Sequence, residues 1–233
     1  MGNPWTDPDF AKAWIRRIGE GGPQRAEAIG VLCLLARAAE PRRILELGVG
    51  SGLIAERLLR DHPDATLVGV DGSEAMLESA AALLQRFDQR FRLVESNFEA
   101  DWPGVTGEGY DLVVSAQSIH HVEGEGKRAV FSKVFSVLAP GGLFLNADRL
   151  AVEEELFPLH RSLWNRSRAR ADFAPLSDAF TYPRYLKALS ESEDVPDRLG
   201  VQLQWLEQVG FDPVISLWQV GDRAVFGGRK PER

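Results

Sequence analysis

The sequence predicts an α/β protein with one mostly parallel sheet that ends in an antiparallel hairpin. Short apolar runs alternate with helical patterns over residues 44–147, which is typical of parallel strands joined by crossover helices. A glycine-rich turn joins the first run to the first helical pattern, and Gly221 with Asp222 separates two later strand-like runs as a hairpin turn would. With 233 residues, of which 44% are hydrophobic, the chain suits a single large domain.

The composition limits the partners that we expect. A net charge of −7 argues against broad electrostatic binding to nucleic acid or to anionic membranes. Cys33 is the sole cysteine, so we expect no intramolecular disulfide and a reducing, cytoplasmic location. No apolar run approaches the ~20 residues of a membrane-spanning helix. Gly2 and Thr6 match a loose myristoylation pattern, but no polybasic stretch follows, and we do not expect lipidation.

Two helices are expected before the first strand. The first can be capped by Thr6 or Asp7, and its apolar residues follow the helical spacing: Ala11, Trp14, Ile15 and Ile18. The second ends before Pro41 and has its own apolar face: Ile29, Leu32, Cys33 and Ala36.

The glycine turn follows a buried strand in residues 43–52, which read R-I-L-E-L-G-V-G-S-G. Glycine recurs there at every second position: Gly48, Gly50 and Gly52. A strand, a glycine turn and a helix in this order present backbone N–H groups at the carboxyl edge of a sheet, where ligands of open α/β sheets bind. A dinucleotide fingerprint requires glycine at the sixth position, which is Leu53 here, and this opposes a nicotinamide-dependent enzyme. On its own, the turn also suits any tight connection from strand to helix.

An acidic residue, Asp71, ends the second predicted strand over residues 66–70. It follows the glycine turn by about the ~20 residues expected of a carboxylate that binds ribose hydroxyls. The alternative is a helix-capping role, because Ser73, Glu74 and a helical pattern come next. The buried face predicted for that helix consists of Met76, Ala80, Leu83, Leu84 and Phe87.

Further motifs follow the later strands in order. The segment S-N-F-E-A-D-W-P comes after a strand at residues 91–95, and A-Q-S-I-H-H-V ends a strand that begins at residue 110. The segment L-A-P-G-G-L-F-L stops a helix with a turn before the fifth strand. With E-L-G-V-G-S-G at residues 46–52, this series resembles the class I S-adenosylmethionine-dependent methyltransferases. The resemblance implies a Rossmann-like seven-stranded mixed sheet, mostly parallel with an antiparallel C-terminal hairpin, and helices on both faces.

The same resemblance implies S-adenosyl-L-methionine as the cofactor and assigns residues to its parts. The methionine portion would be surrounded by Glu46, Gly48, Gly50 and Gly52. Asp71 would bind the ribose, and the adenine would lie among Gly72, Met76, Asn97 and Phe98. The family usually has an acid where this chain has Asn97, whose side-chain carbonyl can accept the same hydrogen bond from the adenine amino group.

His120 and His121 directly follow the fourth strand, at the edge where active-site loops gather. Imidazole, with a pKa near ~6.5, can accept a proton from a hydroxyl or nitrogen acceptor. Neighbouring residues on an extended segment point to opposite sides, so we expect one of the two to face the methyl group. The alternative is that the histidines orient the loop and catalysis is positional. No metal is expected.

Residues 149–198 interrupt the alternation and predict a helical cap insertion. A buried helical face is predicted at Val152, Leu156, Leu159 and Leu163. Several arginines of this segment lie near Trp164 and Tyr182 in the sequence. We predict that the segment forms a lid over the acceptor and that Trp164 and Tyr182 contact the acceptor. The alternative is a solvated arginine face with Trp164 in a local core. The single domain then has N-terminal helices at 1–40, a cofactor-binding core at 41–148, the cap, and a C-terminal helix and hairpin at 199–233.

These observations favour an S-adenosylmethionine-dependent methyltransferase that acts on a small molecule, at an oxygen, nitrogen or carbon atom. An RNA-modifying methyltransferase shares the fold, but the acidic balance opposes nucleic acid as a partner. An NAD-dependent oxidoreductase and a catalytically silent cofactor-binding protein also fit parts of the pattern. The oligomeric state is left open, a homodimer included.

Overall fold

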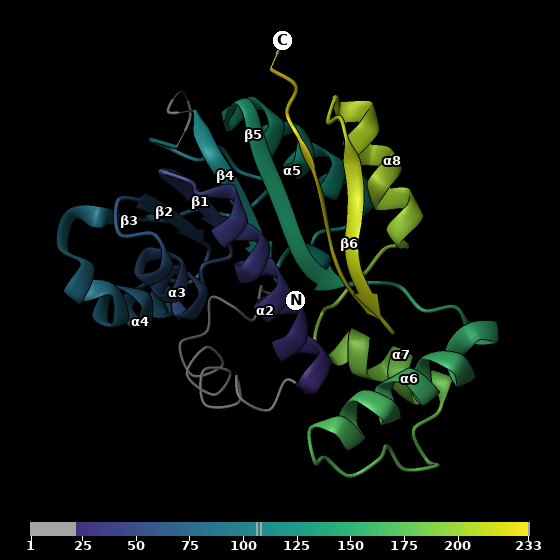
Figure 1. Ribbon diagram of the computed structural model, residues 1–233. Helices are drawn as coiled ribbons and strands as arrows, with labels where there is room; N and C mark the ends of the chain where they lie inside the picture. Colours follow the sequence, from purple (N-terminus) through teal and green to yellow (C-terminus); the bar gives the residue numbers. More distant parts are fainter. Residues whose placement is uncertain (1–21, 106, 108, 233) are drawn as a thin grey trace.

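The computed structural model describes residues 22–105, 107 and 109–232 (Figure 1). Within this part of the chain, a seven-stranded sheet has the order β3-β2-β1-β4-β5-β7-β6. Its strands are β1 (Arg43–Leu47), β2 (Thr66–Asp71), β3 (Phe91–Glu95), β4 (Tyr110–Ala116), β5 (Leu138–Arg149), β6 (Val214–Val220) and β7 (Arg223–Arg229). The first five strands pair in parallel, whereas β7 is antiparallel to both β5 and β6. The predicted mixed sheet is therefore confirmed. The helix expected near residues 6–18 and the Gly2–Thr6 pattern lie outside the described residues.

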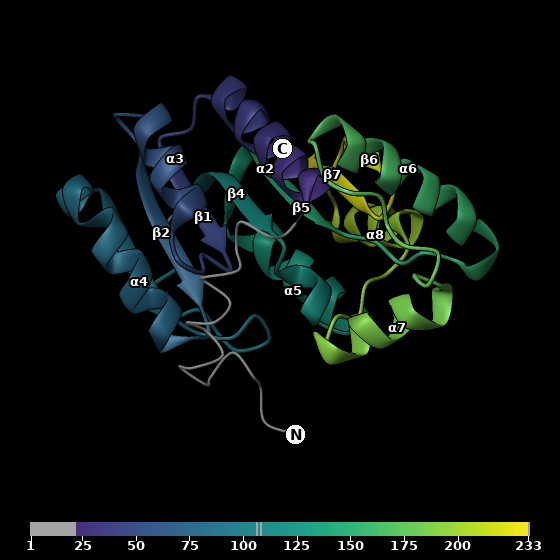
Figure 2. The same ribbon diagram turned by 90° about the horizontal axis from the view of Figure 1, so that it is seen from below.

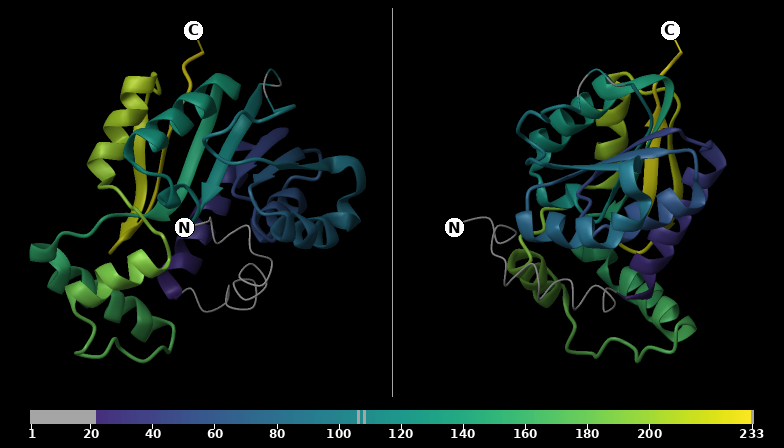
Figure 3. Two further views of the ribbon diagram at one scale, coloured as in Figure 1. Left: turned by 180° about the vertical axis from the view of Figure 1, so that it is seen from behind. Right: turned by 90° about the vertical axis from the view of Figure 1, so that its left-hand side faces the viewer.

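Helices cover both faces of the sheet (Figure 3). One apolar cluster joins the sheet to α2 (Pro23–Ala39), α3 (Leu53–Asp61) and the end of α4 (Glu74–Leu84). The other joins it to α5 (Gly124–Val137) and α8 (Leu199–Val209). Alternation along each strand divides the residues between the clusters, so Ile44 packs toward α2 while Leu45 packs toward α5. No helix in the described part is long and apolar enough to cross a membrane.

Two sequence predictions about α4 and β5 need correction. Leu83 is exposed and Phe87 lies beyond the helix, because α4 ends at Leu84 and the chain continues in a short 3₁₀ turn that bends at Asp88. The fifth strand begins earlier than predicted, at Leu138 rather than after the glycine pair. Residues 139–142 bulge from it, since Leu138 pairs with Tyr110 and the register resumes at Leu143.

The C-terminal signals behave as predicted. Gly210 ends α8 in a left-handed conformation with φ of 115°. Gly221 and Asp222 form the turn between β6 and β7, whose pairing starts at Val220 and Arg223.

The cap consists of α6 (Phe157–Arg170) and α7 (Tyr182–Glu191) and lies beyond the carboxyl end of β5, beside the start of α2 (Figures 1 and 2). Its buried residues form a small core of their own: Val152, Phe157, Trp164, Tyr185 and Leu189. The predicted leucine face is wrong, because Leu156, Leu159 and Leu163 are exposed. The helix turns its aromatic side inward instead, since the aromatic rings bury more surface than leucine would.

Candidate functional site

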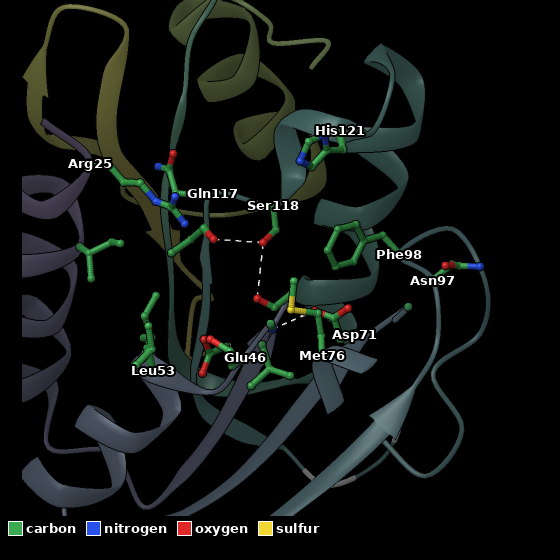
Figure 4. A pocket seen from close by; sticks show the side chains of 18 of the residues that line it. Arg25, Glu46, Leu53, Asp71, Met76, Asn97, Phe98, Gln117, Ser118 and His121 are labelled. Carbon is green, nitrogen blue, oxygen red and sulfur yellow. Dashed lines mark hydrogen bonds between the residues drawn. The ribbon is translucent and has the colours of Figure 1, made fainter. Parts of the chain in front are cut away.

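A cavity of about 340 Å³ lies at the carboxyl ends of the parallel strands (Figure 4). We call it the glycine-loop cavity, because residues 48–51 after β1 form part of its wall. The ends of β2, β3 and β4 supply further walls, and the first turns of α2 close one side. Its volume falls in the range typical of small-ligand sites, at the edge where open α/β sheets bind ligands.

The glycine loop is shaped by close packing. A Cβ atom at Gly48 would overlap the Oγ atom of Ser118, so a larger residue would push away the loop after β4. Gly50 donates its backbone N–H to Asp71 Oδ2 at 2.8 Å. Gly52 lies outside the cavity wall, where it lets the start of α3 pack on Ala80 of α4. Two of the three predicted glycines therefore line the cavity, and the third positions the helix behind it.

Glu46 brings a buried carboxylate to the cavity wall. Its side chain is 1% exposed, and its Oε2 atom has no hydrogen-bond partner among the described residues. Burial first, and then the negative charge of Asp71, raises the pKa of this carboxyl well above its usual value. A buried acceptor of this kind suits a cationic or donor group of a ligand.

Asp71 accepts two backbone hydrogen bonds and also borders the cavity. Its Oδ1 atom accepts the backbone N–H of Ser73 at 3.0 Å at the start of α4, and its Oδ2 atom holds the glycine loop. Burial raises the pKa of Asp71, while the backbone N–H groups of Gly50 and Ser73 act in the opposite direction. The carboxylate also borders the cavity, so capping does not remove it from the site.

The residues expected around an adenine meet on one side of the cavity (Figure 4). They are Gly72, Met76, Asn97 and Phe98. A Cβ atom at Gly72 would overlap Asn97 Oδ1, so glycine lets the amide approach the backbone closely. The ring of Phe98 points toward the cavity, whereas the Asn97 side chain extends to the other side of the loop (Figure 4).

His121 faces the cavity, whereas His120 does not border it. The Nδ1 atom of His121 lies 3.2 Å from the carbonyl oxygen of Glu193, which can only accept a hydrogen bond. Nδ1 is therefore the protonated nitrogen, and Nε2 carries the lone pair. Burial first, and then the charge of His120, lowers the pKa of His121 to about 4, so its ring is neutral at pH 7.

His120 is a buried imidazole held between two carboxylates. Its Nδ1 atom lies 2.5 Å from Asp148 Oδ1, and its Nε2 atom lies 3.4 Å from Asp194 Oδ1. Burial lowers its pKa, but the two carboxylates outweigh this effect and raise it. Within the described chain, His120, His121 and Asp194 have the spacing of a metal site, but Asp194 already pairs with the Arg149 guanidinium. The cluster is therefore better suited to holding the cap against the sheet.

Several lining residues were missed from the sequence. Arg25 and Ile29 of α2 border the cavity, and no sequence signal distinguishes them from other residues of an amphipathic helix. Gln117 and Ser118 also line it, within the same A-Q-S-I-H-H-V segment that contains the two histidines. Their place directly after a parallel strand was the signal that could have identified them.

Trp164 and Tyr182, predicted to contact an acceptor, do not border the glycine-loop cavity. The ring of Trp164 packs in the cap core, and its indole N–H donates to Asp222 Oδ1 of the β6–β7 turn at 2.8 Å. The Tyr182 hydroxyl donates to the Val152 carbonyl at 3.3 Å. Trp164 instead borders a second cavity of about 300 Å³ between the cap, α2 and the β6–β7 turn. We call it the arginine cavity, after the arginines on its wall: Arg149, Arg168 and Arg223.

Comparisons with known proteins agree with this geometry. A family profile described as a methyltransferase domain matches residues 44–142. The trans-aconitate 2-methyltransferase of Acidovorax sp. (strain JS42) is 32% identical over 200 residues, covering 78% of this chain and 74% of that protein. The carboxy-S-adenosyl-L-methionine synthase of Stutzerimonas stutzeri (strain A1501) is 25% identical over 215 residues, covering 88% of this chain and 83% of that protein.

Solved structures extend the likeness in fold. The structure described as PigF with SAH has a TM-score of 0.67 and 17% sequence identity, and the match covers 97% of this chain. The present chain spans 60% of the length of that structure. At this level of identity the likeness concerns the fold alone.

Proposed function

The chain belongs to the family of class I S-adenosylmethionine-dependent methyltransferases, and we propose that it transfers the cofactor's methyl group to a small-molecule acceptor held beneath the helical cap. In this proposal the glycine-loop cavity holds the cofactor. The chain is one domain with the four parts at 1–40, 41–148, 149–198 and 199–233.

Glu46 is the observation that carries the assignment. S-adenosylmethionine has an α-ammonium group, and a buried carboxylate whose Oε2 atom has no hydrogen-bond partner among the described residues supplies the negative acceptor that this cation needs. Gly48 and Gly50 add no side chains to the cavity wall beside this carboxylate, so the loop backbone can approach a ligand closely. The residues present therefore fit the methionine portion of the cofactor.

The remaining parts of the cofactor have fitting partners nearby. Asp71 has oxygen lone pairs toward the cavity in addition to those engaged by backbone N–H groups, and these can accept from ribose hydroxyls. Asn97 offers a side-chain carbonyl to the adenine amino group, with Phe98 and Met76 as the apolar contacts. Gly52 supports this site from behind by fixing the start of α3.

When bound, S-adenosylmethionine supplies an electrophilic methyl group: an acceptor lone pair forms a bond to its carbon while the carbon–sulfur bond breaks and the electron pair stays on sulfur as a thioether. This chain's residues align the reactants and exclude water. For an acceptor atom that bears a proton, the neutral His121 at the cavity wall takes that proton on Nε2. His120 acts through position, because it fixes the segment from which His121 projects.

Two observations favour a small acceptor. Relatives include enzymes named for small molecules, such as the trans-aconitate 2-methyltransferase. The net charge of −7 opposes the electrostatic attraction that an RNA substrate requires.

The sequence also opposes an NAD-dependent enzyme, because Leu53 occupies the sixth position of the glycine motif, where a dinucleotide-binding protein has glycine.

Titration calorimetry with S-adenosylmethionine, S-adenosylhomocysteine and NAD tests the cofactor assignment. We expect the first two to bind and NAD to be inert. The Asp71→Ala variant should bind S-adenosylhomocysteine more weakly by about 2–4 kcal/mol, because two charge-assisted hydrogen bonds to ribose are lost. Tight NAD binding without a response to the sulfonium ligand contradicts the proposal, as does an Asp71→Ala variant that loses thermal stability but keeps its affinity.

A further inference from the structure

The arginine cavity lies next to the glycine-loop cavity and has a different chemical character. Its walls come from the cap helices α6 and α7, the start of α2, the end of β5 and the β6–β7 turn. Gly22 borders both cavities. The Arg223 guanidinium on its wall donates to Gln117 Oε1 at 2.5 Å, and Gln117 lines the glycine-loop cavity. The two cavities therefore adjoin, with Gly22 and the Arg223–Gln117 hydrogen bond at their boundary.

Two residues on this wall each carry a buried polar atom that makes no hydrogen bond. The Tyr185 hydroxyl belongs to a side chain that is 5% exposed, and it has no hydrogen-bond partner among the described residues. In the same part of the chain, the Nε atom of Arg149 lies 3.5 Å from Asp222 Oδ2 as an ion pair but donates no hydrogen bond. Leaving buried donors unsatisfied is unfavourable, so both atoms point to a ligand that supplies acceptor oxygens.

The cavity also has more positive than negative charge on its wall. Of the described residues that line it, Asp222 alone carries a carboxylate, against Arg149, Arg168 and Arg223. Burial first, and then the charges of Arg223 and Arg149, lowers the pKa of the neighbouring Arg25 to about 10. The carboxylates of Asp148, Asp194 and Asp222 offset part of this positive charge. An anionic ligand group would offset more of it.

We propose that the arginine cavity binds a carboxylate group of the acceptor, with Tyr185, Arg149 and Arg168 as the recognition residues. This inference rests on the proposed function, because it assigns the acceptor of that same reaction to the carboxylic acids. The carboxylate is the group by which the acceptor is held, while another part of the molecule reaches the cofactor cavity. Asp222 on the wall repels a dianionic phosphate more strongly than a singly charged carboxylate, so a carboxylate is the better fit.

The test is calorimetric binding to the full chain saturated with S-adenosylhomocysteine, so that no turnover occurs. The probes are succinate, citrate and phenylacetate, compared with the neutral trimethyl ester of citrate and with glycerol phosphate. We expect at least one of the three carboxylates to bind. We expect neither the neutral ester nor glycerol phosphate to bind. Tyr185→Phe removes only the hydroxyl and should weaken carboxylate binding about 10-fold, and Arg168→Gln should do so by about 10-fold or more.

A matched control separates recognition from net charge and stability. Arg166→Gln removes an exposed arginine from the same helix and should leave carboxylate affinity unchanged. The melting temperature of Tyr185→Phe should stay level or rise, because the hydroxyl has no hydrogen-bond partner to lose among the described residues.

The inference is overturned if S-adenosylhomocysteine binds but no carboxylate binds, or if the neutral ester or the phosphate binds better than every carboxylate. It is equally overturned if carboxylate affinity is the same in Tyr185→Phe, Arg168→Gln and the control. In these cases the proposed function stands, because cofactor binding is intact. Loss of S-adenosylhomocysteine binding by the unmodified chain removes the proposed function itself.

Discussion

Glu46 shows how a binding residue can oppose folding. The folded protein raises the pKa of this carboxyl above its ordinary value of 4.5, through burial and then Asp71. The folded state therefore holds a proton over a pH range in which the unfolded chain has released it. Stability must then fall as the pH rises from 4.5 through the raised pKa.

The Glu46→Gln variant removes the titrating carboxyl and, with it, this loss of stability at higher pH. We expect it to be more stable than the unmodified protein by about 1–3 kcal/mol near pH 8, and to lose less stability between pH 5 and pH 8. It should also bind S-adenosylhomocysteine about 10- to 100-fold more weakly, because an amide is a poor partner for the ammonium group. Urea unfolding at several pH values and calorimetry measure the two effects. If Glu46→Gln lost stability as well as affinity, Glu46 would be a structural residue.

The two neighbouring histidines should separate by experiment. Removing the His120 imidazole leaves Asp148 and Asp194 buried without their shared partner, so we expect His120→Ala to cost about 3–5 kcal/mol of stability. Because the folded-state pKa of His120 is raised, its contribution is complete below pH ~6.5 and is lost as the pH rises through the raised value. The stability of His120→Ala, measured by urea unfolding at several pH values, should therefore fall less steeply above neutral pH than that of the unmodified protein.

His121→Ala should instead change turnover. With an acceptor that must lose a proton, we expect a decrease of about 10²–10⁴-fold and loss of the acidic limb of the pH profile near 4. Its folded-state pKa of about 4 lies below the ordinary 6.5, so the unmodified protein should lose stability as the pH falls between these values, and the variant should lose less. Normal turnover and an unchanged profile in His121→Ala would show that catalysis is positional.

At the scale of one element, α6 shows that helical periodicity alone did not decide which face is buried. Leu159 is 64% exposed, whereas Trp164 packs among Phe157, Phe180 and Tyr185. We expect Leu159→Glu to change the free energy of unfolding by no more than about 0.5 kcal/mol. Trp164→Ala should cost about 3–5 kcal/mol, since it leaves a cavity and removes a hydrogen bond to the Asp222 carboxylate. Chemical denaturation of the two variants tests this pair of predictions. A larger loss of stability in Leu159→Glu than in Trp164→Ala would mean that the leucine face is the buried one.

At the scale of the whole molecule, polar contacts join the cap insertion, residues 149–198, to the rest of the fold, the Trp164–Asp222 hydrogen bond among them. The buried Lys127 of α5 donates to Val195 and Asp197, and Arg149 pairs with Asp194. Replacing residues 157–191 with the equivalent segment of a relative, while keeping these contacts, should change the choice of acceptor. It should alter S-adenosylhomocysteine affinity by less than about threefold, because no residue of that segment borders the described part of the glycine-loop cavity. A swap that abolishes cofactor binding and leaves acceptor choice unchanged would contradict this division.

The sequence alone determined the alternation of strands and helices and the edge of the sheet at which the glycine-loop cavity lies. Alternating apolar runs, the glycine turn after Glu46 and the Gly221–Asp222 hairpin are local patterns, and the backbone requirements behind them act over a few residues. The carboxyl ends of parallel strands meet at one edge, so Asp71, Asn97 and His121 could be placed together before any contact was known.

Only the tertiary structure decided how side chains divide between cavity, core and surface. It turned His120 away to Asp148 while leaving His121 at the cavity, although the two are adjacent in sequence. It also brought Arg25 beside Arg149 and Arg223, which lie far apart along the chain. These outcomes depend on burial and charge pairing between distant segments, and such energies arise only when the segments pack together.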